Sequence, residues 1–307
     1  MLPSAKNREW HQYAIANSFS APNRYVFHVC HVDDAFRIFE DGEIHPSLVC
    51  DESKLRTTRT SVVWLSPNDW RQGFRYGSVA FKFEWKRLVE GKQLYWVEAV
   101  NYYHPPAFRI LVSHQPVIPL ELYPAQTDDG PLFHDAAHDA WFYNGRCTGE
   151  FLFDGAIPLS KCVSVLFVKH HPTMCTRNPP CNDLGAEGDK CGARLLARLI
   201  AQPKIRHVRR LFREQQSGRL HRNSAEALGH LIRSLAVDKN KGGKIRHAHS
   251  AAPYLACAIL DRFGTHQQTA ALRNLFRNTH ELRQAINERA SLLLPALKRT
   301  NRRKEEI

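Results

Sequence analysis

The feature that most limits the fold of this 307-residue chain is a change in its hydrophobic pattern along the sequence. Up to Val168, short apolar runs rich in β-branched and aromatic residues alternate with turn residues, which predicts strands. These runs are RYVFHV, SVVWLSP, SVAFKFEW, QLYWVEAVNYY, FRILVS, EFLFDG and CVSVLFV. From Cys191 onward, apolar residues recur at helical spacing instead. We therefore expect an α+β protein, with a mixed β-sheet core and short helices followed by a basic all-α C-terminal domain.

Two helical segments illustrate the change. An early one interrupts the strands, because Val32, Ala35, Phe36 and Phe39 share a helical face and Gly42 stands where a helix would end. In the second half, four or five helices are separated by Pro and Gly residues. Their predicted apolar faces are formed by Leu195, Leu196, Leu199 and Ile200, and by Leu272, Leu275, Phe276, Leu282, Ile286 and Leu293.

The net charge of +13 is spread unevenly along the chain. Residues 1–191 carry 19 Lys and Arg against 22 Asp and Glu, whereas residues 192–307 carry 24 against 8. Such asymmetry favours a polyanionic partner for the second half, most often nucleic acid, although a basic solvated surface or acidic lipid fits the charge alone. The basic residues expected to contact nucleic acid are Arg209, Arg210, Lys244, Arg273 and Arg277.

The remaining composition points to the cytoplasm. No run approaches the roughly 20 apolar residues of a membrane span, and residues 1–14 lack the apolar segment of a signal peptide. Eight cysteines are too few for a disulfide scaffold of this length. In a reducing compartment they would be thiols or metal ligands.

Two blocks of sequence carry a resemblance to a known family. The first is YVFHVCHVDDAFRIFEDGEI, which begins at Tyr25 and contains His28 and His31. The second is GEFLFDGAIPLSKCVSVLFV, which begins at Gly149 and contains Glu150. In this order, the chain as far as Val168 resembles the DarT-like branch of the ADP-ribosyltransferase superfamily, and the helical second half has no counterpart in it. The resemblance implies an ADP-ribosyltransferase-like mixed sheet that uses NAD⁺ as a substrate.

By this resemblance, Glu150 is the catalytic glutamate and His28 binds the ribose of NAD⁺. Cleavage of the nicotinamide–ribose bond develops positive charge on the sugar, which a nearby carboxylate stabilises. The histidine would hold the cofactor, and an arginine would neutralise the diphosphate or orient the acceptor. Arg56 and Arg59 both precede the second strand, and we favour Arg59 because it lies nearer to it.

Each of these residues also has a purely structural interpretation. Glu150 could be an ordinary edge-strand glutamate, His28 a core histidine, and His31 simply the first residue of a helix. Trp64 stands where the wider superfamily often has Tyr. Its indole could stack on nicotinamide, or it could simply belong to the core. The other candidates for cofactor binding are Cys30, Ser66 and Tyr76, and Tyr76 is the alternative aromatic wall.

A third group of residues has the composition of a metal site. Counted from His171, the spacing H-x3-C-x5-C-x9-C brings in Cys175, Cys181 and Cys191 within a segment rich in Pro and Gly. The order is that of a CCCH zinc finger read backwards, which suggests structural zinc, and three free thiols in a linker are the alternative.

Together these features divide the chain into a catalytic domain (1–172), a Cys-rich junction (173–191) and a basic helical nucleic-acid-binding domain (192–307). We expect mono-ADP-ribosylation of a base in single-stranded DNA or RNA, because a stacked base cannot reach a catalytic pocket. The resemblance adds a toxin or phage-defence role and a neutralising antitoxin partner. The alternatives are a protein-directed ADP-ribosyltransferase and a nucleic-acid-binding protein without catalysis.

Overall fold

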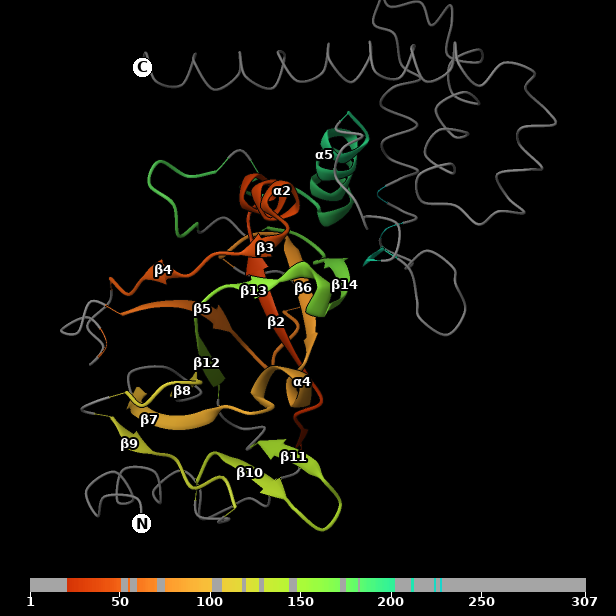
Figure 1. Ribbon diagram of the computed structural model, residues 1–307. Helices are drawn as coiled ribbons and strands as arrows, with labels where there is room; N and C mark the ends of the chain where they lie inside the picture. The colour runs from red at the N-terminus through yellow and green to blue at the C-terminus, as the bar shows by residue number, and fades with distance from the viewer. Residues whose placement is uncertain are drawn as a thin grey trace, which may run out of the picture. The chain divides into compact units, whose positions relative to one another are not determined.

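Strands dominate the part of the chain that the computed structural model describes, and the fold is of the mixed α+β kind (Figure 1). The described residues are 21–50, 55, 60–70, 75–100, 107–117, 120–126, 130–143, 148–171, 175–181, 183–201, 211, 212, 224 and 227. They fall into two compact units that are discontinuous in sequence. The first unit takes residues within 1–28, 41–69 and 81–163, and the second takes residues within 29–40, 70–80 and 164–307.

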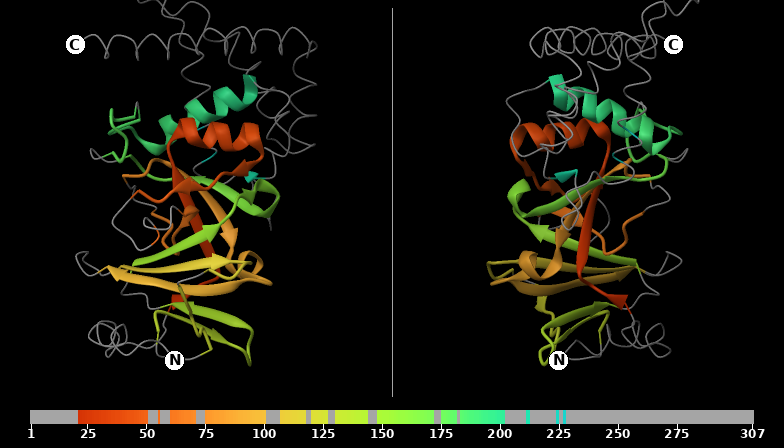
Figure 2. Two further views of the ribbon diagram at one scale, coloured as in Figure 1. Left: turned by 60° about the vertical axis from the view of Figure 1, so that its left-hand side comes forward. Right: turned by 90° about the vertical axis from the view of Figure 1, so that its right-hand side faces the viewer.

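A six-stranded sheet forms the centre of the first unit. Its spatial order is β4 (Ser47–Leu48), β5 (Ser61–Leu65), β12 (Thr148–Asp154), β8 (Ala107–Ser113), β7 (Gln93–Val100) and β9 (Glu121–Leu122). β8 and β12 run parallel, and all other neighbours in this sheet are antiparallel. The long pair β7 and β8 lies side by side in both views of Figure 2.

Both faces of this sheet are covered, which explains why β8 is a nearly continuous apolar run with all seven residues buried. On one face, Leu111 and Leu152 belong to a hydrophobic cluster that also contains Val49, Leu55, Val62, Tyr95 and Val97. On the other face, Phe151 packs against Trp85 with ring centroids 4.3 Å apart.

Smaller elements complete the first unit. Trp85 begins the short helix α4 (Trp85–Val89), although the sequence pattern had included it in the preceding strand. A three-stranded sheet has the order β1 (Ala21–Pro22), β11 (Ala140–Tyr143) and β10 (Leu132–Asp135), and a two-stranded one pairs β13 (Ile157–Pro158) with β3 (Glu43–Ile44). The 3₁₀ helix η1 (Leu159–Lys161) follows β13.

A further sheet has the order β14 (Cys162–Phe167), β6 (Val79–Glu84) and β2 (Tyr25–Cys30). The division of the chain into units falls inside each of these three strands.

Two helices characterise the second unit. α2 (Val32–Asp41) lies beside α5 (Gly188–Ala201) in Figures 1 and 2. Arg198 of α5 joins them, because its guanidinium lies 3.9 Å from the ring centroid of Phe36 and donates to Asp33 at 2.5 Å. The apolar face of α2 is buried as its spacing predicts, and it consists of Val32, Ala35, Phe36, Ile38 and Phe39.

The structure confirms most of the expected elements. All seven strand-like runs contain a strand, and the early helix begins at Val32 and ends next to Gly42, which has φ +80°. In α5, Leu195, Leu196 and Leu199 are buried as expected. The later helices expected beyond residue 227 lie outside the described residues. Within the described part, no helix has the length and the apolar character needed to cross a bilayer.

Candidate functional site

Arg109 is the only charged residue in β8, and it is 4% exposed. A buried guanidinium requires anionic partners, because desolvation of an unpaired charge is costly. Its neighbours in the sheet provide two. Arg109 stands opposite Glu150 of β12 and opposite Glu98 of β7. Its Nε donates to Glu150 Oε2 at 2.6 Å, and its Nη1 donates to Glu98 Oε1 at 2.9 Å.

A β-bulge in β7 creates the second of these pairs. The register shifts between Trp96, which faces Ile110, and Glu98, which faces Arg109. In a regular ladder Val97 would stand opposite Arg109, so the bulge replaces an apolar partner by a carboxylate. Bulges often redirect side chains in this way beside functional sites.

Two more of the residues implicated by sequence join this group. The guanidinium of Arg109 lies 5.1 Å from the ring centroid of Trp64, within reach of a cation–π interaction. The Nδ1 of His28 is 2.9 Å from the backbone oxygen of Trp64. Since a carbonyl only accepts, Nδ1 carries the proton of this hydrogen bond. The side chains of Trp64, His28 and Glu150 are therefore linked through Arg109 and the backbone of β5. We call Glu98, Arg109, Glu150, Trp64 and His28 the glutamate–arginine array.

Ser66 lies next to this array. The backbone groups of Ser66 and Phe27 exchange hydrogen bonds of 2.7 and 2.9 Å, which fix β2 beside the end of β5. The hydroxyl of Ser66 accepts from the backbone of Asn68 at 3.1 Å. Ser66 thus has a local structural role in a position adjacent to His28.

The other residues predicted for the cofactor and the acceptor are placed differently. Cys30 and Tyr76 belong to the second unit. Burial, and after it the carboxylate of Asp34, raises the pKa of the Cys30 thiol well above its usual value, so Cys30 is an inert thiol. Tyr76 is exposed and lies against Arg75. Arg59 lies outside the described residues, as do Arg209, Arg210, Lys244, Arg273 and Arg277.

Sequence reasoning missed Arg109 and Glu98. A signal for Arg109 was present in the apolar run FRILVS. A lone arginine in such a run must either have its side chain in solvent or be paired with an anion inside the sheet. Nothing in the sequence indicated Glu98, because its position depends on the bulge.

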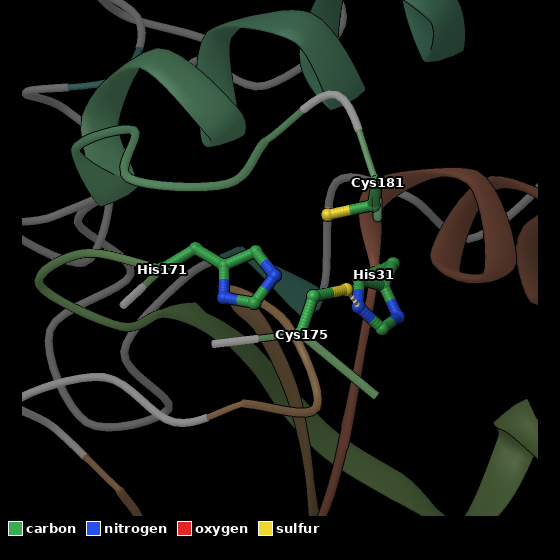
Figure 3. Close-up of side chains that lie close together, drawn as sticks. All are labelled: His31, His171, Cys175 and Cys181. Carbon is green, nitrogen blue, oxygen red and sulfur yellow. Dashed lines mark hydrogen bonds between the residues drawn. The ribbon is translucent and has the colours of Figure 1, made fainter. Parts of the chain in front are cut away.

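A second group of chemically reactive side chains lies in the second unit (Figure 3). His31, His171, Cys175 and Cys181 each offer one ligand atom, and these four atoms lie within 4.8 Å of one another. In Figure 3 the two sulfur atoms and the two rings face a common space. The His31 Nε2 atom is 3.2 Å from Cys175 Sγ, and the rings of His31 and His171 meet edge to face at 5.2 Å. We call these four residues the His–Cys cluster.

The electrostatics of the cluster centre on His31 and Cys175. Burial disfavours the charge on His31, but the carboxylate of Asp34 and the thiols of Cys181 and Cys175 outweigh it and raise the pKa of His31 to about 10. Burial also disfavours the Cys175 thiolate, yet hydrogen bonds from the backbone at Cys181 and Arg177 and the contact with His31 lower its pKa to about 7. The cluster therefore favours a thiolate.

The cluster differs by one residue from the metal set inferred from spacing. Cys191 is absent from it, and His31 is present instead. Cys191 lies in the first turns of α5, is fully buried, and has its pKa raised to about 12 by burial and by Asp183. It is a neutral core thiol. His31 also begins α2, since its carbonyl accepts from the Ala35 N–H at 2.9 Å, as the helix-start interpretation expected.

Comparisons of the chain with protein-family models, with curated proteins and with solved structures found no match.

Proposed function

We propose that the first unit is a mono-ADP-ribosyltransferase that cleaves NAD⁺ and transfers ADP-ribose to a base of single-stranded DNA or RNA. The observation that carries this proposal is the position of Glu150. It lies on an inner strand of the main sheet and is paired to the buried Arg109. The Arg109 guanidinium in turn lies 5.1 Å from the ring centroid of Trp64, whose backbone oxygen accepts from His28. The family resemblance assigns catalysis to Glu150 and makes His28 and Trp64 candidates for cofactor binding.

The charged groups around Glu150 suit this chemistry. Breaking the nicotinamide–ribose bond requires a fixed negative charge near the sugar as positive charge develops. The Nε of Arg109 donates to Oε2 of Glu150 and so fixes the carboxylate, while the Nη1 of Arg109 donates to Glu98. Oε1 of Glu150 would then meet the ribose, as an acceptor for a hydroxyl or as a charge beside the anomeric carbon. Arg109 is thus a positioning residue and Glu150 the catalytic one.

His28 and Trp64 would hold NAD⁺. With Nδ1 donating to Trp64, a neutral His28 ring would use Nε2 as the acceptor for a ribose hydroxyl. The half-buried Trp64 indole packs against the apolar cluster of Leu111 and Leu152 and lies near the Arg109 guanidinium, and its exposed part would stack on a flat nicotinamide or adenine ring. A cofactor held by both groups would have its sugar fixed for reaction, which lowers the entropy cost of the transition state.

The preference for a nucleic-acid acceptor is based on charge. The 24 Lys and Arg against 8 Asp and Glu in residues 192–307 would bind phosphates without reading sequence. A base in a single strand is accessible without the cost of unstacking. An enzyme of this kind would damage its own cell, so we also propose a toxin or phage-defence role with a neutralising antitoxin.

The test uses the full chain with labelled NAD⁺ and separate pools of DNA, RNA and protein. We expect label on single-stranded nucleic acid and a loss of at least about 10²-fold in the Glu150→Gln variant, as for removal of a preorganised transition-state group. Glu98→Gln removes the same charge from the other side of Arg109 and should cost less than about tenfold. Glu90→Gln, at an exposed position after α4, is the control and should behave as the parent chain.

The outcomes separate the alternatives. Label on the protein pool alone would favour a protein-directed transferase. Nucleic-acid binding without any NAD⁺ turnover would favour a non-catalytic binding protein. Equal losses in Glu150→Gln and Glu98→Gln would mean that the carboxylates matter only as partners of Arg109, and the catalytic assignment of Glu150 would fail.

A further inference from the structure

We propose that His31, His171, Cys175 and Cys181 form a structural zinc site in the second unit. The donor set is the starting point. Two imidazoles and two thiols form a common ligand set for structural Zn²⁺, which binds four N and S ligands in a tetrahedron. A soft set of this kind disfavours Mg²⁺ and Ca²⁺, which prefer oxygen ligands.

The distances fit this geometry. Zn–N bonds of about 2.0 Å and Zn–S bonds of about 2.3 Å place the ligand atoms of a tetrahedron about 3.3 to 3.8 Å apart. The four ligand atoms of the cluster lie within 4.8 Å of one another, and His31 Nε2 is 3.2 Å from Cys175 Sγ. Side-chain adjustments of about 1 Å would therefore complete the site without moving the backbone.

The residues that contact the ligands also support a zinc site, because they orient an imidazole and stabilise a thiolate. The Nδ1 atom of His31 lies 3.6 Å from Asp34 Oδ2, so the carboxylate orients the ring with Nε2 toward the cluster. The backbone N–H of Arg177 donates to Cys175 Sγ at 3.4 Å, which stabilises a thiolate. Arg177 also donates to Asp34, so the loop that carries the cysteines is tied to α2 by the same carboxylate.

The role of the site follows from the segments that it joins. His31 stands between β2 and α2, and His171 follows β14, where its N–H donates to the backbone of Ala186 at 2.8 Å. Cys175 and Cys181 lie on a loop with little core of its own, because Asp183 is the only buried residue described from 175 to 187. A bound metal would hold this loop to His31 and His171 in place of a hydrophobic core.

Four protein ligands, including the fully buried His171, close the coordination sphere. Catalytic zinc sites instead keep one position open for water or substrate. The site is therefore structural, and it is independent of the proposed transferase chemistry.

The experiment measures metal in the full chain purified without chelator. We expect about one Zn²⁺ per chain, and replacement by Co²⁺ should give the visible spectrum of a tetrahedral ion with thiolate charge-transfer bands. Cys175→Ser should lose the metal, whereas Cys50→Ser, at an exposed cysteine outside the cluster, should keep it. Asp34→Asn should weaken zinc binding about 10- to 100-fold in competition with a chromogenic chelator.

Cys175→His keeps four ligands and tests the site if the serine variant fails to fold. It should retain Co²⁺ with about half of the charge-transfer intensity, because one of the two thiolates remains. The proposal would be overturned by a folded chain that neither contains zinc nor binds cobalt. A Cys175→Ser variant with undiminished metal would overturn it as well.

Discussion

Replacement of Arg109 by Met should be among the most destabilising single changes in the first unit. The Arg109 side chain is 5% exposed, and those of Glu98 and Glu150 are 20% and 17% exposed. Methionine keeps much of the packing on Trp64 but leaves two partly buried carboxylates on either side of an apolar group. Removing one partner from a buried ion pair costs about 3–5 kcal/mol. We expect the lower end, about 3 kcal/mol, because both glutamates retain some access to water.

Urea unfolding followed by tryptophan fluorescence measures this cost, which corresponds to a shift of the midpoint by about 1–2 M urea. The matched control adds Glu98→Gln and Glu150→Gln to the same variant. The triple variant should recover to within about 1 kcal/mol of the parent chain, because neutral groups replace the whole charged set. A single variant within about 0.5 kcal/mol of the parent, or a triple variant without recovery, would refute the electrostatic reasoning.

Two further predictions test the local geometry, one at Gly77 and one at Tyr123. Gly77 has φ +130°, and a Cβ there would overlap the carbonyl of Cys30, so Gly77→Ala should cost at least about 2 kcal/mol in thermal unfolding. Gly91→Ala, at φ +68° with open space around it, should cost about 1 kcal/mol, and equal costs would contradict the overlap. The buried Tyr123 hydroxyl donates to the Leu132 carbonyl at 2.6 Å and accepts from its N–H at 2.9 Å. Tyr123→Phe should therefore cost about 1–3 kcal/mol, and a change below about 0.5 kcal/mol would mean that water replaces both bonds.

The sequence was sufficient to predict seven of the strands and the early helix. Each predicted strand is a short run dominated by β-branched and aromatic residues, so local composition determines its secondary structure. The helix from Val32 was equally clear, because its apolar face repeats at i, i+3 and i+4 and Gly42 follows it. The two-residue strands β1, β3, β4, β9 and β13 were missed, since two residues carry no periodicity, and the four-residue strands β10 and β11 were missed as well.

The sites were only partly predictable, because their assembly is nonlocal. Glu98 reaches Arg109 through a register shift that no local pattern encodes. His31 lies 140 positions before His171, so a search for ligands by spacing chose the nearer Cys191. Cys191 belongs to α5, and its sulfur is not among the four ligand atoms that lie within 4.8 Å of one another. Spacing identifies ligands that share a loop, and long-range ligands become visible only once the fold is known.

The strand β2 and His31, the residue after it, contribute one histidine to each of the two proposed sites. His28 lies in the part of the strand that belongs to the first unit, where it donates to the backbone of Trp64. His31 lies three residues later in the second unit, where its Nε2 faces Cys175. Two histidines that look equivalent in the motif FHVCH therefore have different chemistry. The proposals can accordingly fail separately, since zinc content is measured without NAD⁺ and transfer is tested at Glu150, outside the cluster.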